Sequence, residues 1–196
     1  MASDEEDVPD GRMIAWPLER LARVMRAREH EGGLNPAQWE ALRFLARANR
    51  FSDSPMALTR YLGATKGTIS QTLMALERKG FITKSLRPGK RKSLRLGLTA
   101  EAYALLARDP WAALANATED LGPKTRRRMQ RGLEELLAEE LKRSRLASFG
   151  LCATCRFFRE RGRAEDQNGP HLCMLFEDAL SSDDAGKICI EHAPAG

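Results

Sequence analysis

The chain has 196 residues, of which 42% are hydrophobic and 30% are charged, and its formal net charge is +5. A chain of this size can bury one ordinary core and carry a small additional module. No apolar run approaches the roughly 18 residues that a membrane span needs, so the sequence predicts that the protein does not cross a membrane.

The first eleven residues carry five acidic side chains, and no basic residue precedes Arg12. This is the opposite of the positively charged start of a secretory signal peptide. We therefore expect a disordered acidic tail over residues 1–11 and a cytoplasmic protein. In that compartment thiols stay reduced unless they bind metal or take part in redox chemistry.

Two amphipathic helices are expected next. Residues 11–28 form the first, with Pro17 close to its first turn, and residues 36–49 form the second, with Asn35 as its N-cap. Apolar side chains recur at helical spacing in both: Ile14, Leu18, Leu21 and Met25 in the first, and Trp39, Leu42 and Leu45 in the second.

Residues 54–99 contain the pattern around which the chain is organised, a short helix, a tight turn, a longer helix and two short strands. The short helix is expected from Met56 to Leu62, between an N-cap at Ser54 and a stop at Gly63. The longer helix is expected over residues 66–79, capped by Thr65 and ended by Gly80. Its inward face carries Ile69, Leu73 and Leu76. Strands over residues 81–86 and 93–98 flank a basic turn.

The other side of the longer helix carries small, polar or cationic side chains, which are the kinds that fit a major groove. They are Lys66, Thr68, Gln71, Thr72 and Ala75. Residues 56–95 hold ten Lys or Arg side chains against one acid, so the positive charge of the chain is concentrated here. We expect base contacts from Thr68, Gln71 and Thr72, a phosphate contact from Lys66, and minor-groove contacts from the turn residues Lys90, Arg91 and Lys92.

After the strands, Thr99 can cap a helix from Ala100 to about Arg108, with a break at Pro110 and a firmer end at Gly122-Pro123. Residues 123–147 then read as a long, charged helix. Its apolar stripe consists of Met129, Leu133, Leu136, Leu137 and Leu141. A chain of this size hardly needs such a helix for its own core, so we predict that it pairs with the first helix across a two-fold interface.

Several of these segments together resemble the winged helix-turn-helix of the MarR family of bacterial transcriptional regulators. The resemblance rests on residues 34–42, on Leu76-Glu77-Arg78-Lys79-Gly80-Phe81-Ile82, and on Leu96-Gly97-Leu98-Thr99 after the basic turn. It extends over about residues 12–147. The family usually carries an Asp two residues before an Arg in the wing, where this chain has Lys90 and Lys92, so that ion pair is missing and the wing is expected to be more mobile.

The resemblance implies a homodimer on a pseudo-palindromic operator in double-stranded DNA, with one recognition helix in each half-site. It also implies a small-molecule effector bound between the dimerisation helices and the winged domain. Trp39 is expected in the core, whereas Trp16 and Trp111 are candidates for lining such a pocket.

All four cysteines fall in the last 45 residues. Cys152-x2-Cys155 is followed by Cys173 and Cys189, and His171 and His192 lie in the same stretch. Four thiolates can make a closed tetrahedral site, and a segment of this size needs more than burial to hold it together. We predict a zinc site on the four cysteines, with His192 or His171 as reserve ligands. A 4Fe-4S cluster on the same thiolates is the alternative.

The sequence thus predicts a mainly α protein with a small β wing, divided into a tail over residues 1–11, a winged helix and dimerisation region over 12–147, and a metal-stabilised module over 148–196. It contains no phosphate-binding glycine loop, no His-Glu-x2-His helix and no nucleophile motif, so we expect a transcriptional repressor and no enzyme. Two alternatives remain: a thiol redox protein that uses Cys152 and Cys155, or a metal-dependent module that docks another protein.

Overall fold

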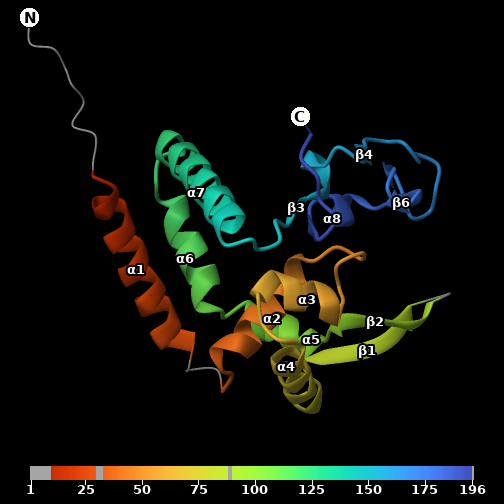
Figure 1. The fold of residues 1–196 in the computed structure, drawn as a ribbon, viewed down its shortest axis with the longest axis horizontal. Coiled ribbons are helices and arrows are strands. Elements are labelled where there is room, and N and C mark those ends of the chain that lie inside the picture. Colours follow the sequence, from red (N-terminus) through yellow and green to blue (C-terminus); the bar gives the residue numbers. More distant parts are fainter. Residues whose placement is uncertain (1–9, 30–32, 88–89, 196) are drawn as a thin grey trace, which may run out of the picture.

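The computed structural model of the chain describes residues 10–29, 33–87 and 90–195, so nearly all of the expected acidic tail lies outside the described residues. Figure 1 shows the helices at residues 11–28, 110–119 and 123–143 together on the left, the winged helix domain below them, and the small C-terminal module in blue above the wing. Within the described residues, no helix is long and apolar enough to cross a membrane. The expected mainly α fold with a small β wing is confirmed.

The first two helices match the expected ranges closely. Helix α1 spans Gly11–Arg28 with Asp10 as its N-cap, and α2 spans Pro36–Arg47. Asn35 and Gln38 form a capping box at the start of α2, which satisfies two backbone N–H groups that the helix itself leaves free. Trp39 is buried, as expected, and its indole N–H donates to the Glu29 carbonyl across 2.8 Å.

Helices α3 (Pro55–Leu62) and α4 (Lys66–Arg78) form the helix-turn-helix. Ser54 caps α3 as predicted, and Gly63 ends it with a φ of 60°, a left-handed conformation that glycine adopts without strain. Thr65 caps α4 by accepting a hydrogen bond from the Thr68 amide. Three α4 side chains, Ile69, Leu73 and Leu76, enter the core as predicted.

The wing consists of the antiparallel strands β1 (Ile82–Arg87) and β2 (Lys90–Leu98). The expected turn over residues 87–92 was too long, because the ladder continues past Leu86, shifts register, and places Arg87 opposite Lys90. The backbone of Lys90, Arg91 and Lys92 therefore belongs to β2, while their side chains lie outside what the structure describes.

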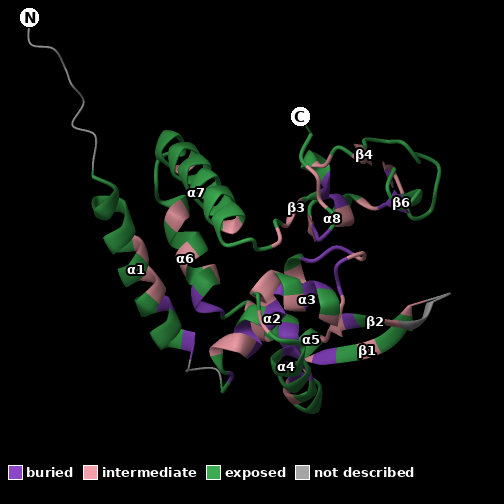
Figure 2. Cartoon of the chain, viewed as in Figure 1, coloured by how far each residue is buried: buried purple, intermediate pink, exposed green. Residues whose placement is uncertain are grey.

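Helices α5 (Ala100–Leu106), α6 (Pro110–Glu119) and α7 (Pro123–Arg143) follow the wing. The breaks fall at the prolines that the sequence predicts. Helix α7 ends four residues before the expected Ala147, with Ser144 as its C-cap and Arg145 at a φ of 54°. Figure 2 shows that α1 and α7 are mostly exposed, whereas the buried residues gather in the winged domain.

The C-terminal module consists of short elements. They are β3 (Gly150–Leu151), the 3-10 turn η2 (Cys152–Thr154), β4 (Phe158–Arg159), β5 (His171–Cys173), β6 (Asp178–Leu180), α8 (Ser182–Ala185) and β7 (Ile188–Cys189). Strand β3 pairs with β7, and β4, β5 and β6 form a three-stranded sheet. The module is not a detached appendage, because Ile190 is buried in the same core as α2, α3 and α4.

Candidate nucleic-acid interface and thiol cluster

Helix α4 leaves an exposed face opposite its core face. Lys66, Thr68 and Gln71 lie on it as predicted. Ser70, Met74 and Arg78 are exposed on the same helix and were not predicted, although residues 67, 71, 74 and 78 recur at helical spacing and could have been read from the sequence. A helix with such a face can enter a major groove and offer hydrogen-bonding groups to base edges.

Thr72 departs from the prediction that it points away from the core. Its side chain is only 8% exposed, and its hydroxyl donates to the Thr68 carbonyl across 3.0 Å. The physical reason is that Thr72 lies one turn from Leu76 and Ile69, on the edge of the face that packs inward. The structure therefore buries one of the three side chains expected to contact bases, and the base contacts themselves stay predictions.

A groove of about 400 Å³ separates α3, α4 and the wing. Arg60, Lys66 and Lys84 line it, so its walls carry cations from all three elements. Lys84 also reaches Glu77 of α4 across 2.6 Å, which ties the first wing strand to the helix. Arg60 and Lys84 were not predicted as interface residues, yet their position suits contacts with a phosphate backbone.

The wing is anchored to the loop before α3 by Asp53, which the sequence interpretation overlooked. The Asp53 carboxylate accepts a hydrogen bond from Arg95 Nε at 2.8 Å and pairs with the guanidinium of Arg87. Burial raises the pKa of the Asp53 carboxyl, and the two arginines offset only part of that rise. The ion pair missing from the wing tip is thus replaced here by one that joins both strands to the loop before α3.

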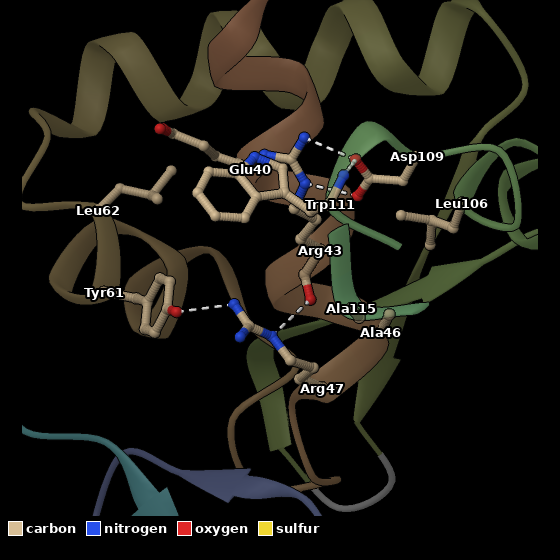
Figure 3. A pocket seen from close by; sticks show the side chains of 10 residues that line it. All are labelled: Glu40, Arg43, Ala46, Arg47, Tyr61, Leu62, Leu106, Asp109, Trp111 and Ala115. Atoms are coloured by element: carbon tan, nitrogen blue, oxygen red, sulfur yellow. Dashed lines mark hydrogen bonds and ion pairs between the residues drawn. The ribbon is translucent and has the colours of Figure 1, made fainter. Parts of the chain in front are cut away.

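A pocket of about 700 Å³ lies between α2, α3 and α6, within the size range of small-molecule sites (Figure 3). Arg43 donates from Nε and Nη2 to Asp109, the N-cap of α6, and also contacts Glu29 across 2.7 Å. Trp111 lines this pocket, as the sequence suggested. Trp16, the second expected lining residue, is 63% exposed on α1 and does not line it.

The four cysteines, the thiol cluster, lie around one small cavity of about 10 Å³, together with Phe157, Phe158 and Leu180. All four thiols are free; Cys152, Cys173 and Cys189 are buried, and Cys155 is half-buried. Strand pairing brings them together, since Gly150 lies opposite Cys189 and Phe158 opposite Cys173. The topology thus gathers side chains that are up to 37 residues apart in the sequence.

Two N–H groups point at these sulfurs, from Asn49 Nδ2 to Cys152 Sγ across 3.0 Å and from the Ala193 amide to Cys155 Sγ across 3.5 Å. A hydrogen bond from Cys152, with further bonds from Asn49, lowers the pKa of Cys189 to about 6, while the same partnership raises the pKa of Cys152. Donors aimed at sulfur stabilise thiolates, the form in which cysteine binds metal.

The donor set therefore suits a soft metal, and the cavity has room for about one atom of water size. Within the described ranges, no three Cys, His, Asp or Glu side chains are already close enough to hold one ion. A tetrahedral zinc site needs Zn–S distances of about 2.3 Å, so the sulfurs would close inward on a single ion. A 4Fe-4S cluster would be held by the same four thiolates.

The two histidines make other contacts. His192 Nε2 lies 3.1 Å from the Thr154 hydroxyl, and His171 Nδ1 accepts from the Arg161 amide across 3.2 Å. Neither is among the residues that line the cavity. Burial of Cys152 also disfavours the thiol redox alternative, because reactive dithiols are partly exposed.

Residues 32–93, which include α2, α3, α4, β1 and the start of β2, match the model of the MarR family. No curated protein matches the sequence of the chain. The chain therefore resembles the MarR family over its winged helix.

Several solved structures share the fold. A MarR transcriptional regulator from Methanosarcina mazei Go1 is 22% identical, with a TM-score of 0.53 over 67% of this chain and 96% of that one. MepR, a transcription regulator of the Staphylococcus aureus multidrug efflux pump MepA, is 16% identical, with a TM-score of 0.51 over 67% of this chain and 98% of that one. An S. aureus MepR–DNA complex is 15% identical, with a TM-score of 0.50 over 68% of this chain and 99% of that one.

Proposed function

We propose that this chain is a DNA-binding transcriptional repressor that acts as a homodimer on a pseudo-palindromic operator. The observation that carries the proposal is the exposed polar face of α4 next to a groove whose walls hold Arg60, Lys66 and Lys84. Helix and wing together offer base readout and phosphate contacts on one side of the domain. The match to the MarR family model over residues 32–93 and the shared fold of MepR, which binds DNA, support it.

We propose that the exposed helices α1 and α7 bind a second copy of the chain. Helix α1 contacts α6, and both α1 and α7 leave large apolar side chains exposed, among them Met13, Ile14, Leu133, Leu136 and Leu137. No residue of α7 is buried in the single chain. A two-fold interface would cover both stripes at once and would place two copies of α4 for successive half-sites.

The pocket beside Arg43 suits a small-molecule effector. Its walls combine aromatic and aliphatic side chains with two arginines and two acids, Glu40 and Asp109, so a small molecule with an apolar body and a few polar groups is the fitting class. Because the pocket joins the winged domain to α6, an occupant would change the angle between DNA-binding and dimerisation helices.

The C-terminal module is proposed to hold a metal centre on Cys152, Cys155, Cys173 and Cys189. Zinc is the first candidate, and a 4Fe-4S cluster is the alternative. The common cavity and the N–H groups directed at sulfur support the site. When bound, the metal would supply cross-links for a module that has few buried side chains of its own.

Selection from a random duplex library with the full-length chain tests the DNA-binding proposal. The expected result is a consensus with two-fold symmetry and half-sites about one helical turn, roughly 10 base pairs, apart. Retention of all duplexes alike, or of none, would contradict a sequence-specific regulator.

Oxygen-free purification, followed by an absorption spectrum and metal analysis of the same sample, tests the metal proposal. One zinc per chain in a colourless protein supports the first candidate, and a brown protein with iron and sulfide supports the alternative. A chain that carries neither, after growth with both metals, would exclude the metal centre.

A further inference from the structure

The loop of residues 49–53, between α2 and α3, contacts the thiol cluster directly. Asn49 is fully buried, and its Nδ2 donates to Cys152 Sγ across 3.0 Å. The Asn49 amide donates to the Ile188 carbonyl, one residue before Cys189, across 3.0 Å. On the other side of Cys189 along the chain, the Ile190 amide donates to Ser52 Oγ across 2.8 Å. The 49–53 loop therefore brackets Cys189 and reaches a second cysteine.

The middle of the same loop contacts the rest of the module. The Arg50 amide donates to Asp184 of α8 across 3.0 Å, and its guanidinium lies 3.2 Å from Asp178 of β6. The Phe51 ring stacks on Phe176, which lines the cysteine cavity, at a centroid distance of 4.3 Å. These contacts depend on a folded module, because both carboxylates and the Phe176 ring are placed by its short strands and helix.

The other side of the 49–53 loop holds the wing. The Leu96 amide of β2 donates to the Asp53 carbonyl across 2.8 Å, and the Asp53 carboxylate pairs with Arg87 of β1 and Arg95 of β2. Arg87 also donates to the Arg50 carbonyl. One guanidinium therefore contacts both the residue that meets the module and the residue that anchors the wing.

The loop itself is folded tightly enough to transmit a displacement. The Phe51 amide donates to Asn49 Oδ1 across 3.0 Å, and the Ser52 and Asp53 amides donate to the Asn49 carbonyl at 2.9 and 3.1 Å. Ser54, the N-cap of α3, follows immediately. A shift of Asn49 thus moves the hydrogen-bonded turn that places both Asp53 and the start of the helix-turn-helix.

From these contacts we infer that the 49–53 loop couples the thiol cluster to the wing, so that a thiolate-bound metal centre in the cluster sets the affinity for DNA. This inference rests on the proposed function. A metal bound by Cys152 and Cys189 would hold the module against the loop, because Asn49 bonds both Cys152 Sγ and the Ile188 carbonyl. Loss of the metal destabilises the module, so that Asn49 and Arg50 lose their contacts with it. The loop then no longer holds Asp53 in place against the wing strands. Such coupling changes affinity by about 5-fold to 150-fold in typical allosteric proteins.

The test compares the metal-loaded and metal-stripped full-length chain, using the form, zinc or iron–sulfur, that oxygen-free purification gives. Fluorescence anisotropy measures the Kd for the duplex recovered by selection, and hydrogen exchange measures amide protection in residues 49–53 and 82–98. We expect stripping to raise the Kd about tenfold and to lower amide protection in both segments. Unchanged protection in residues 82–98 would overturn the coupling.

A matched pair of substitutions, Arg87→Gln and Arg95→Gln, separates coupling from a general loss of charge. Both remove one wing cation and one ion pair with Asp53, but only Arg87 contacts the Arg50 carbonyl. In the Arg87→Gln variant, the ratio of the Kd of the stripped form to the Kd of the loaded form should fall toward one. In the Arg95→Gln variant, this ratio should stay close to that of the unmodified chain. Equal ratios in the two variants would overturn the assigned route.

The two proposals fail in distinguishable ways. If no duplex is bound by either form, the DNA-binding proposal fails, and hydrogen exchange still reports whether the metal state reaches residues 82–98. If a duplex is bound equally well by both forms with equal wing protection, only the coupling fails. If stripping unfolds the whole chain, the loaded forms of the two variants decide: both lose an ion pair with Asp53, but Arg87→Gln should lower wing protection more than Arg95→Gln, because only Arg87 also bonds the Arg50 carbonyl. Equal loss of protection in the two variants would overturn the assigned route.

Discussion

Arg43 of α2 donates two hydrogen bonds to Asp109, at 2.6 Å from Nε and 3.0 Å from Nη2, and Asp109 is also the N-cap of α6. Glu29, at the end of α1, contacts the same guanidinium across 2.7 Å and accepts a hydrogen bond from the Trp111 indole. Both carboxylates are almost completely buried. One arginine of the winged domain thus contacts both the end of α1 and the start of α6.

Replacing this arginine should destabilise the fold strongly. Arg43→Met leaves two buried carboxylates without their cation, which costs about 3–5 kcal/mol in the free energy of unfolding when one partner of a buried pair is removed. Arg47→Met is the matched control, because Arg47 is exposed and its guanidinium bonds the Tyr61 hydroxyl, so its loss should cost less than about 1 kcal/mol. Urea denaturation followed by circular dichroism measures both, and equal midpoints would argue against the network.

A second prediction separates base readout from phosphate contact. Gln71→Ala should reduce discrimination between operator variants by about 1–3 kcal/mol at one base position, because an exposed amide on α4 can hydrogen-bond a base edge. Lys92→Ala should weaken binding to all duplexes alike and reduce the salt slope by about one. Titrations of each variant against the selected and a scrambled duplex, at several salt concentrations, measure both effects. A uniform loss in both variants would show that the recognition face is assigned wrongly.

The winged domain could be predicted well because its signals are local. Caps at Asn35, Ser54 and Thr65, the stop at Gly63 and the spacing of apolar residues each lie within one turn of the element that they define. The face of α4 was predicted from the same periodicity. This prediction placed Thr72 wrongly, because that residue lies at the edge of the buried stripe, and it left out the exposed Ser70, Met74 and Arg78.

The contacts that join the modules could not be predicted in this way. Asn49 and Cys152 are 103 positions apart, and Ser52 and Ile190 are 138 positions apart. An asparagine and a serine in a polar connection look like ordinary turn residues, and Asp53 looks like a solvated acid. Only the folded structure shows that Asn49 and Ser52 bond the C-terminal module and that Asp53 pairs with two arginines of the wing.

The dimer proposal gives a third prediction. Leu137 is 58% exposed on α7, so Leu137→Glu should have little effect on the folded monomer, yet it places a charge in the proposed interface. We expect a shift from dimer to monomer in sedimentation equilibrium and weaker binding to a two-half-site duplex. Glu139→Arg, also exposed on α7 and about 200° away around the helix, is the control. If Leu137→Glu leaves the assembly unchanged, the interface lies elsewhere.

A fourth prediction concerns the ligands of the metal centre. Cys155→Ser and Cys173→Ser should each lower the metal content of the purified chain to less than about half, because a serine hydroxyl is a poor substitute for a soft thiolate ligand. His192→Ala and His171→Ala should keep the full content, because both rings are hydrogen-bonded outside the cavity that the four sulfurs line. Metal analysis of the four variants, purified side by side without oxygen, measures the difference.

Loss of metal from His192→Ala together with its retention in one cysteine variant would replace the four-cysteine site with a Cys3His site. Because the cysteine substitutions also remove buried side chains, circular dichroism at the same concentration must show that helices α1 to α7 remain folded.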